Sequence, residues 1–122
     1  MSPAAKRSGM FLGRDVLSEL SGRWRITWME TWDQDFVDLI EPGYFQFDEN
    51  RVGFFVFGAV QGQVDYRISD DGTRVDLSWS GNDEGCETSG RGWFKLSSSN
   101  LTKKYLFIHR GDESAVNIEK QT

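Results

Sequence analysis

The chain has 122 residues, of which 14% are aromatic, 13 are glycine and 2 are proline, and its net charge is −5. This length suits one domain, and the acidic charge would repel a phosphate backbone, so we expect no nucleic-acid partner. Because no apolar run approaches the roughly 20 residues that cross a bilayer, and Cys86 has no intrachain disulfide partner, we expect a cytoplasmic protein without a membrane segment.

The N-terminal region predicts a tail followed by a short helix. Residues 1–14 show no hydrophobic periodicity, and we expect them to form a flexible tail before a single domain at residues 15–122. From Asp15 to Leu20 the pattern favours a helix, with Asp15 as its N-cap and Gly22 beyond its end. A helix of this length is not stable alone, so its apolar face must pack against the next strand.

The stretch Gly22–Trp32 reads as a long strand. Strict alternation would place one set of side chains on its dry face: Trp24, Ile26, Trp28, Glu30 and Trp32. Glu30 is the exceptional member, because it is a carboxylate between two tryptophans. Such a group is a candidate to donate a hydrogen bond to a ligand or to transfer a proton. The alternative is a structural pair with Arg110, Arg91 or Tyr66.

Short strands recur after an acidic connection, Asp33–Pro42, which predicts a short helical flap. The expected strands are Arg23–Trp32, Gly43–Asp48, Arg51–Val60, Gln63–Ser69, Thr73–Gly81, Arg91–Ser97, Leu101–His109 and Ser114–Lys120. Asp71-Gly72 and the polar run Ser97–Asn100 are turn signals. Eight strands joined mostly by hairpins favour an all-β fold, an up-and-down antiparallel β-barrel with the short N-terminal helix at its closed end.

If every strand reverses direction, the connections divide between two ends of the barrel. The tight turns fall at one end, the floor. The connections expected at the other end, the mouth, are Asp33–Pro42, Gln61-Gly62, Asn82–Gly90 and Arg110–Glu113. The mouth is rich in acids, which favours neutral or cationic ligands. Asn82–Gly90 is expected to be either a mobile lid or a solvated connection.

The short helix followed by Gly22-Arg23-Trp24 resembles the Gly-x-Trp opening of the calycins, the lipocalin and avidin superfamily. That resemblance implies a small barrel in which the tryptophan packs across the floor and a flap, here Asp33–Pro42, guards the mouth. The chain departs from lipocalins at the Ser97–Asn100 turn, which lacks their Thr-Asp-Tyr type motif, and at Lys120, where they place an arginine. It also lacks the ligand motifs of avidin.

An eight-stranded barrel either fills with side chains or holds one small ligand. The leading hypothesis is that the mouth binds a small, partly apolar molecule. The candidate ligand-binding residues are Trp28, Glu30, Trp32, Tyr66, Trp79 and His109.

Two other functions remain open. In an enzyme, Glu30 and His109 would form an acid–base pair. His109 is the only histidine, and metal motifs with real specificity carry two or more His or Cys residues, so we predict no metal site and no cofactor. In a solid-core interaction module, outward aromatic residues would support a homodimer, because Phe54–Phe57, Trp93-Phe94 and Tyr105–Ile108 are apolar on both faces.

Overall fold

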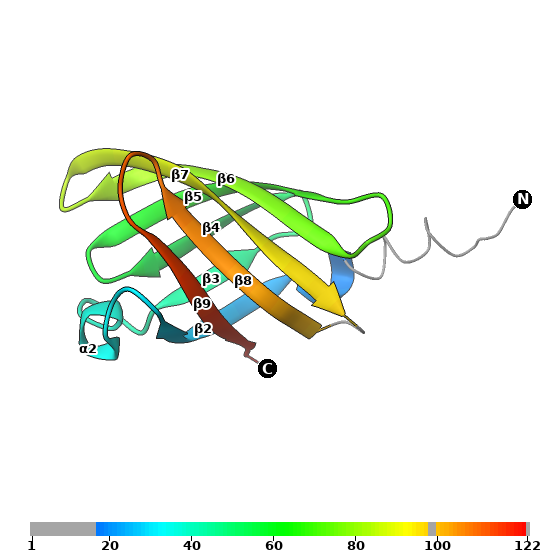
Figure 1. Ribbon diagram of the computed structural model, residues 1–122, viewed down its shortest axis with the longest axis horizontal. Coiled ribbons are helices and arrows are strands. Elements are labelled where there is room, and N and C mark those ends of the chain that lie inside the picture. The colour runs from blue at the N-terminus through cyan, green and yellow to red at the C-terminus, as the bar shows by residue number, and fades with distance from the viewer. Residues whose placement is uncertain (1–16, 98–99, 122) are drawn as a thin grey trace, which may run out of the picture.

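The computed structural model describes residues 17–97 and 100–121, which form a closed antiparallel barrel. Each strand pairs with its neighbours in the chain, and the first pairs with the last, so the predicted up-and-down fold is confirmed (Figure 1). The strands are β2 (Gly22–Met29), β3 (Tyr44–Phe47), β4 (Val52–Phe57), β5 (Val60–Ile68), β6 (Arg74–Asp83), β7 (Cys86–Ser97), β8 (Asn100–Ile108) and β9 (Glu113–Lys120).

Parts of the sequence-based prediction lie outside the described residues. These parts are the expected tail at residues 1–14, the start of the expected helix at Asp15, and the centre of the expected Ser97–Asn100 turn. Within the described residues, no helix is both long and apolar enough to cross a bilayer.

The floor of the barrel is closed by the end of the N-terminal helix. Residues 17–20 are helical, and Leu20 is buried in the core. The indole Nε1 of Trp24 donates to the carbonyl of Leu20 at 2.8 Å, and Ser21 donates from its backbone and its hydroxyl to the carbonyl of Leu17. The helix end therefore packs onto the first strand, as its apolar face requires.

The mouth is covered by the connection between β2 and β3, which contains the short helix α2 (Gln34–Val37). The carboxylate of Asp33 accepts a hydrogen bond from Phe36 N at 2.9 Å and so caps the helix. Val37 is fully buried, and its carbonyl accepts from Gly58 N at 2.8 Å. The predicted helical flap is thus confirmed, and it is attached to the β4–β5 turn.

Aromatic rings fill the barrel interior. Phe55 packs against Phe45 and Trp79 with ring centroids 5.0 Å apart in each case, and Phe94 lies 5.7 Å from both Phe45 and Phe47. All of these rings are buried. Such contacts stabilise the fold beyond simple burial, so the interior described here is a packed core.

The prediction that Trp28 and Glu30 point inward is wrong. The β2–β9 register shifts between Ile26 and Trp28, so that the intervening Thr27 forms a bulge. A bulge adds one residue and inverts the alternation beyond it. Met29 is therefore buried, whereas Trp28 is 47% exposed and Glu30 lies at the surface.

The segment Asn82–Gly90 is not a long loop, contrary to the prediction. Strands β6 and β7 continue through it to a two-residue turn at Glu84-Gly85, where both φ angles are positive (53° and 87°). This is the backbone of the tight turn whose twist matches a hairpin. The turn expected at Gln61-Gly62 is also displaced: the chain turns at Gly58-Ala59, and Gln61 lies within β5.

Candidate functional site

Glu30, which the sequence indicated as a ligand-binding or proton-transferring acid, lies on the outer surface. Its Oε1 accepts a hydrogen bond from Ala115 N at 3.2 Å, and its own backbone N donates to the carbonyl of Ala115 at 3.0 Å. Glu30 therefore extends the β2–β9 pairing beyond the bulge. Among the described residues, it forms no ion pair with Arg91 or Arg110.

Three of the predicted ligand-binding residues do point inward, but they lie in different parts of the barrel. Trp32 is half-buried beneath α2, with its ring 4.9 Å from that of Phe57. Trp79 is buried and donates from Nε1 to the carbonyl of Phe107 at 3.2 Å. Tyr66 is buried at the floor, where its hydroxyl donates to the carbonyl of Asp48. Burial, with a smaller effect from the Asp48 carboxylate, raises the pKa of Tyr66 to about 12.

His109 lies at the mouth end, as strand parity predicts, in the turn between β8 and β9. It is exposed, and its backbone N donates to the carbonyl of Ser89 at 2.7 Å. No hydrogen bond or ion pair joins His109 to Glu30 within the described part of the chain. No group of three His, Cys, Asp or Glu side chains among those residues is placed to hold a metal ion.

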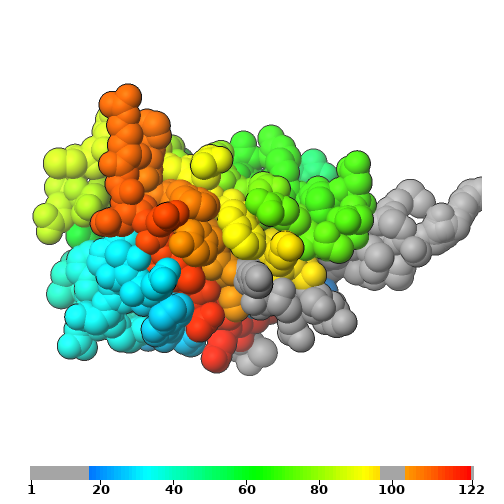
Figure 2. Space-filling model, viewed as in Figure 1, coloured from blue at the N-terminus to red at the C-terminus, as the bar shows by residue number. Residues whose placement is uncertain are grey.

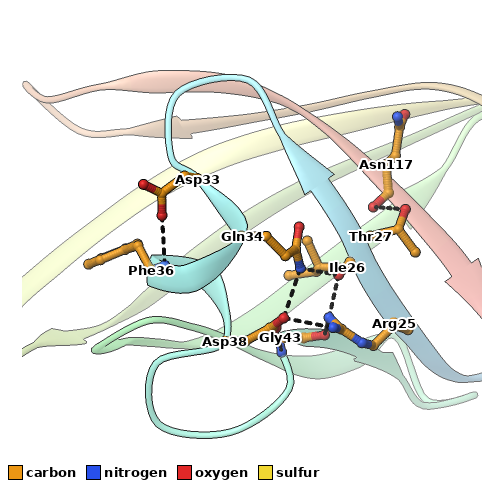
Figure 3. Close-up of polar contacts among 9 residues, drawn as sticks. All are labelled: Arg25, Ile26, Thr27, Asp33, Gln34, Phe36, Asp38, Gly43 and Asn117. Atoms are coloured by element: carbon orange, nitrogen blue, oxygen red, sulfur yellow. Dashed lines mark hydrogen bonds and ion pairs between the residues drawn. The ribbon is translucent and has the colours of Figure 1, made fainter.

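Polar contacts around Asp38 fasten the flap over the mouth (Figure 3). The carboxylate of Asp38 accepts from Arg25 Nη2 at 2.8 Å, from Gly43 N at 2.8 Å and from Gln34 Nε2 at 3.0 Å. Partial burial raises the pKa of Asp38, but these hydrogen bonds outweigh burial, so the pKa lies below its ordinary value of 3.8. An ionised Asp38 thus joins both ends of the flap to β2.

The β6–β7 hairpin, the α2 segment and the β8–β9 turn gather at the mouth end of the molecule (Figure 2). An open groove of about 930 Å³ lies on the outer face of β4 to β7 near this end. Its polar lining is formed mainly by uncharged side chains: Gln61, Gln63, Ser80, Asn82, Thr88 and Ser89, with Glu87 as the acid and Phe54 as the aromatic ring. We call this surface the amide groove.

Strand register builds the amide groove in two rows. Phe54 pairs with Gln63, Gln63 with Ser80, and Ser80 with Ser89, so one row crosses four strands. A second row, one step nearer the mouth, runs from Gln61 through Asn82 to Glu87. Adjacent strands lie about 4.8 Å apart, so the first row spans about 14 Å.

The side-chain amides of the groove are available to a ligand. Among the described residues, those of Gln61, Gln63 and Asn82 form no hydrogen bond within the protein. An amide offers both a carbonyl acceptor and an NH₂ donor. The groove therefore presents donors and acceptors together with little charge.

Buried rings support the groove from beneath. Gly62 and Gly81 are opposite each other on the inner side of β5 and β6. A Cβ added to Gly62 would lie 2.5 Å from the ring of Phe55 and 2.9 Å from that of Trp79. These rings occupy the space directly below the strands, so packing holds the backbone that carries the groove.

A smaller pocket of about 280 Å³ adjoins the amide groove, and Ser89 lines both. It lies between β7 and the end of β8. Its lining residues are Ser89, Gly90, Arg91, Phe107, Ile108, His109 and Arg110. Two of them are arginines and none is an acid, which distinguishes this pocket from the amide groove.

Comparison with protein-family models, with curated proteins and with solved structures returns no match. Sequence reasoning missed the groove because it considered inward positions and passed over the outward ones. A signal is present in the sequence: Gln61 and Gln63 alternate with buried positions on one strand, and Ser80 and Asn82 are two residues apart on the next. Neutral amides and hydroxyls at successive outward positions are the pattern that could have located it.

Proposed function

We propose that this protein binds a polyhydroxylated small molecule, a carbohydrate, in the amide groove. The observation that carries the proposal is the set of unbonded amide side chains, arranged in register with hydroxyls on adjacent strands. Sugar hydroxyls both donate and accept hydrogen bonds, as amides and serine hydroxyls do. The sequence-based hypothesis of a small-molecule site at the mouth end is kept, but we now place the site on the outer face of the barrel.

Two further features of the groove suit a sugar. Phe54 lies at one end of the first row and offers an apolar surface to the C–H groups of a sugar ring. Glu87 lies in the second row, where its carboxylate oxygens can accept hydrogen bonds from hydroxyls. An exposed neutral hydrogen bond contributes about 0.5–1.5 kcal/mol, so a few such bonds in an open groove give weak binding, with a dissociation constant on the order of 1 mM.

The alternative small-molecule function is binding of a partly apolar ligand inside the mouth. The groove is preferred because Trp28 and Glu30 face outward and Tyr66 lies at the floor. The six candidate residues therefore do not surround one ligand. The enzyme hypothesis has the weaker support for a similar reason, because no contact joins Glu30 to His109 among the described residues.

Isothermal titration calorimetry with glucose, maltose, cellobiose and lactose tests the proposal. We expect at least one of these sugars to bind, and the Gln63→Ala/Asn82→Ala double variant to weaken binding at least tenfold. Asn117→Ala is the matched control, since Asn117 is an exposed outward amide residue on β9, away from the groove. Unchanged affinity in the double variant would contradict the proposal.

Kinship with the calycins is a second proposal, about ancestry and not ligand. It is supported by the closed eight-stranded barrel, the helix end at the floor and the burial of Trp24 against Leu20. These features are compatible with the calycin fold.

A homodimeric interaction module is a second candidate function, favoured by apolar side chains at the surface. Leu39 is 61% exposed and Ile40 66% exposed, both just after α2, and Trp28 is 47% exposed. Exposed apolar groups of this size favour association. Sedimentation velocity should then show a dimer for the wild type and a monomer for the Leu39→Ser/Ile40→Ser variant. A monomeric wild type would contradict this candidate.

A further inference from the structure

We propose that the small pocket beside the amide groove binds a carboxylate or phosphate group, so that the ligand is an anionic carbohydrate. This inference rests on the proposed function of the groove and specifies the class of sugar. The pocket is lined by Arg91, His109 and Arg110, and it shares Ser89 with the groove. A ligand that lies along the groove can therefore extend into the pocket without leaving the surface.

The connection between pocket and groove is fixed by the backbone. The amide of His109 donates to the carbonyl of Ser89 at 2.7 Å, which places the β8–β9 turn beside the end of the first groove row. Arg91 is two positions beyond Ser89 on β7, so both side chains lie on the outer face. The cationic groups are thus adjacent to the last hydroxyl of the row.

Within the part of the chain that the structure describes, the arginines of this pocket have no acidic partner. Elsewhere on the barrel, Arg25, Arg67 and Arg74 form ion pairs with aspartates. Among the described residues, Arg91 and Arg110 form neither an ion pair nor a hydrogen bond through their guanidinium groups. In a chain with a net charge of −5, two unpaired guanidinium groups around one pocket are a local reversal of charge, suited to an anion.

Arg91 is held in place without using its hydrogen-bond donors. Its guanidinium carbon lies 5.4 Å from the centroid of the Phe107 ring. Stacking on an aromatic ring positions the planar group and leaves its N–H groups free for a carboxylate or phosphate. The nearby acids are Asp76, diagonal to Arg91 on β6, Glu113, opposite Phe107 on β9, and Asp112, two residues after Arg110, and none of them lines the pocket.

The backbone of Arg110 adds a second observation. Its φ is +58°, in the left-handed region that long side chains rarely adopt. Two hydrogen bonds of 2.9 Å hold the turn, from Ile108 N to the carbonyl of Asp112 and from Gly111 N to the carbonyl of Ile108. Arg51 and Glu84 adopt the same region in other turns, so this conformation belongs to the turn, which holds Arg110 beside the pocket.

An acid on one side of Ser89 and an arginine on the other set the orientation of the ligand. Glu87 lies on the mouth side of Ser89, and Arg91 lies on its floor side. The anionic group is therefore placed toward Arg91, and the neutral hydroxyls lie along the amides of β5 and β6.

Calorimetry with glucose, glucose 6-phosphate, glucuronate and inorganic phosphate tests this inference. We expect glucose 6-phosphate or glucuronate to bind the wild type about tenfold more tightly than glucose, and the anion with the larger gain identifies phosphate or carboxylate as the preferred group. The gain should shrink in 0.5 M NaCl, because salt screens exposed charges. Arg91→Gln and Arg110→Gln should each reduce the gain while glucose still binds.

Arg67→Gln is the control, because Arg67 is exposed and ion-paired on β5 near the floor. It should leave the gain unchanged. Equal affinity for glucose and both anions overturns this inference and leaves the amide groove standing. Binding of glucose 6-phosphate or glucuronate that is unaffected by Gln63→Ala/Asn82→Ala supports the cationic pocket but overturns the proposed function, so the two failures are distinguishable. Inorganic phosphate, which reaches only the pocket, should bind this variant and the wild type equally.

Discussion

The outer face of β5 and β6 changes character halfway along the barrel. Toward the floor it carries charged residues, and Arg67 and Arg74 each pair with an aspartate two positions away on the same strand. Toward the mouth the outward residues of the same two strands are uncharged: Gln61, Gln63, Ser80 and Asn82. Both halves face solvent, so solubility alone does not explain the change. In the floor half the charged side chains pair with one another, whereas in the mouth half the polar side chains remain available to a ligand.

The largest expected effect concerns the packed rings beneath the mouth half. Phe55→Ala should lower the free energy of unfolding by about 3–5 kcal/mol, because it leaves a cavity where the rings of Phe45, Phe57 and Trp79 now meet. Denaturant unfolding measures the change. Phe54→Ala is the matched control: Phe54 precedes Phe55 but lines the groove, and its removal should cost less than about 1 kcal/mol. Equal losses in both variants would contradict the assigned faces.

A smaller effect is expected from the flap. Asp38→Asn should lower the free energy of unfolding by about 1–2 kcal/mol at neutral pH, because the neutral side chain cannot accept the same set of hydrogen bonds from Arg25, Gln34 and Gly43. The pKa of Asp38 is lower in the folded protein than in the unfolded chain. Its stabilising contribution is therefore complete above about pH 4 and is lost as the pH falls toward the folded-state pKa.

Unfolding curves measured from pH 7 down to pH 2 test this contribution. The difference between wild type and Asp38→Asn should shrink as the pH falls below about 4. Asp35→Asn, a change at an exposed acid in the same segment, serves as the control and should run parallel to the wild type. A difference that persists at pH 2 would show that the carboxylate of Asp38 is not responsible.

The smallest effect is expected in the floor half. The side chains of Arg67 and Asp65 are 67% and 56% exposed, and ion pairs this exposed contribute little to stability. Arg67→Ala should change the free energy of unfolding by less than about 0.5 kcal/mol and should not alter sugar binding. A clear loss of sugar affinity in this variant would extend the binding surface beyond the mouth half.

Strand rhythm and parity were sufficient to predict the barrel, its floor and its mouth. They failed where one residue changed the register. The bulge at Thr27 depends on how β2 meets β9, and the local pattern from Trp24 to Trp32 alternates without a glycine or proline to indicate it. The prediction for Asn82–Gly90 was wrong for another reason. The composition of this segment is typical of a loop, but the segment forms two paired strands.

Only part of the candidate site could be predicted from the sequence. Of the predicted ligand-binding residues, Trp79 and Tyr66 are buried inside the barrel, but they lie in different parts of it. The amide groove depends on the cross-strand alignment of Phe54, Gln63 and Ser80. The prediction placed the β4–β5 turn three residues too late, and this error hid the alignment. Alignment between strands is a tertiary property, and alternation within one strand does not reveal it.

Two-dimensional ¹H–¹⁵N NMR, with the tightest-binding sugar titrated into the protein, tests binding in the amide groove most directly. We expect the largest shift changes on the side-chain amides of Gln61, Gln63 and Asn82 and on nearby backbone amides of β5 to β7. The indole of Trp79, which lies inside the barrel, should respond weakly. Changes centred on the indoles of Trp79 and Trp32, with the groove amides unaffected, would place the ligand inside the barrel and contradict binding in the groove.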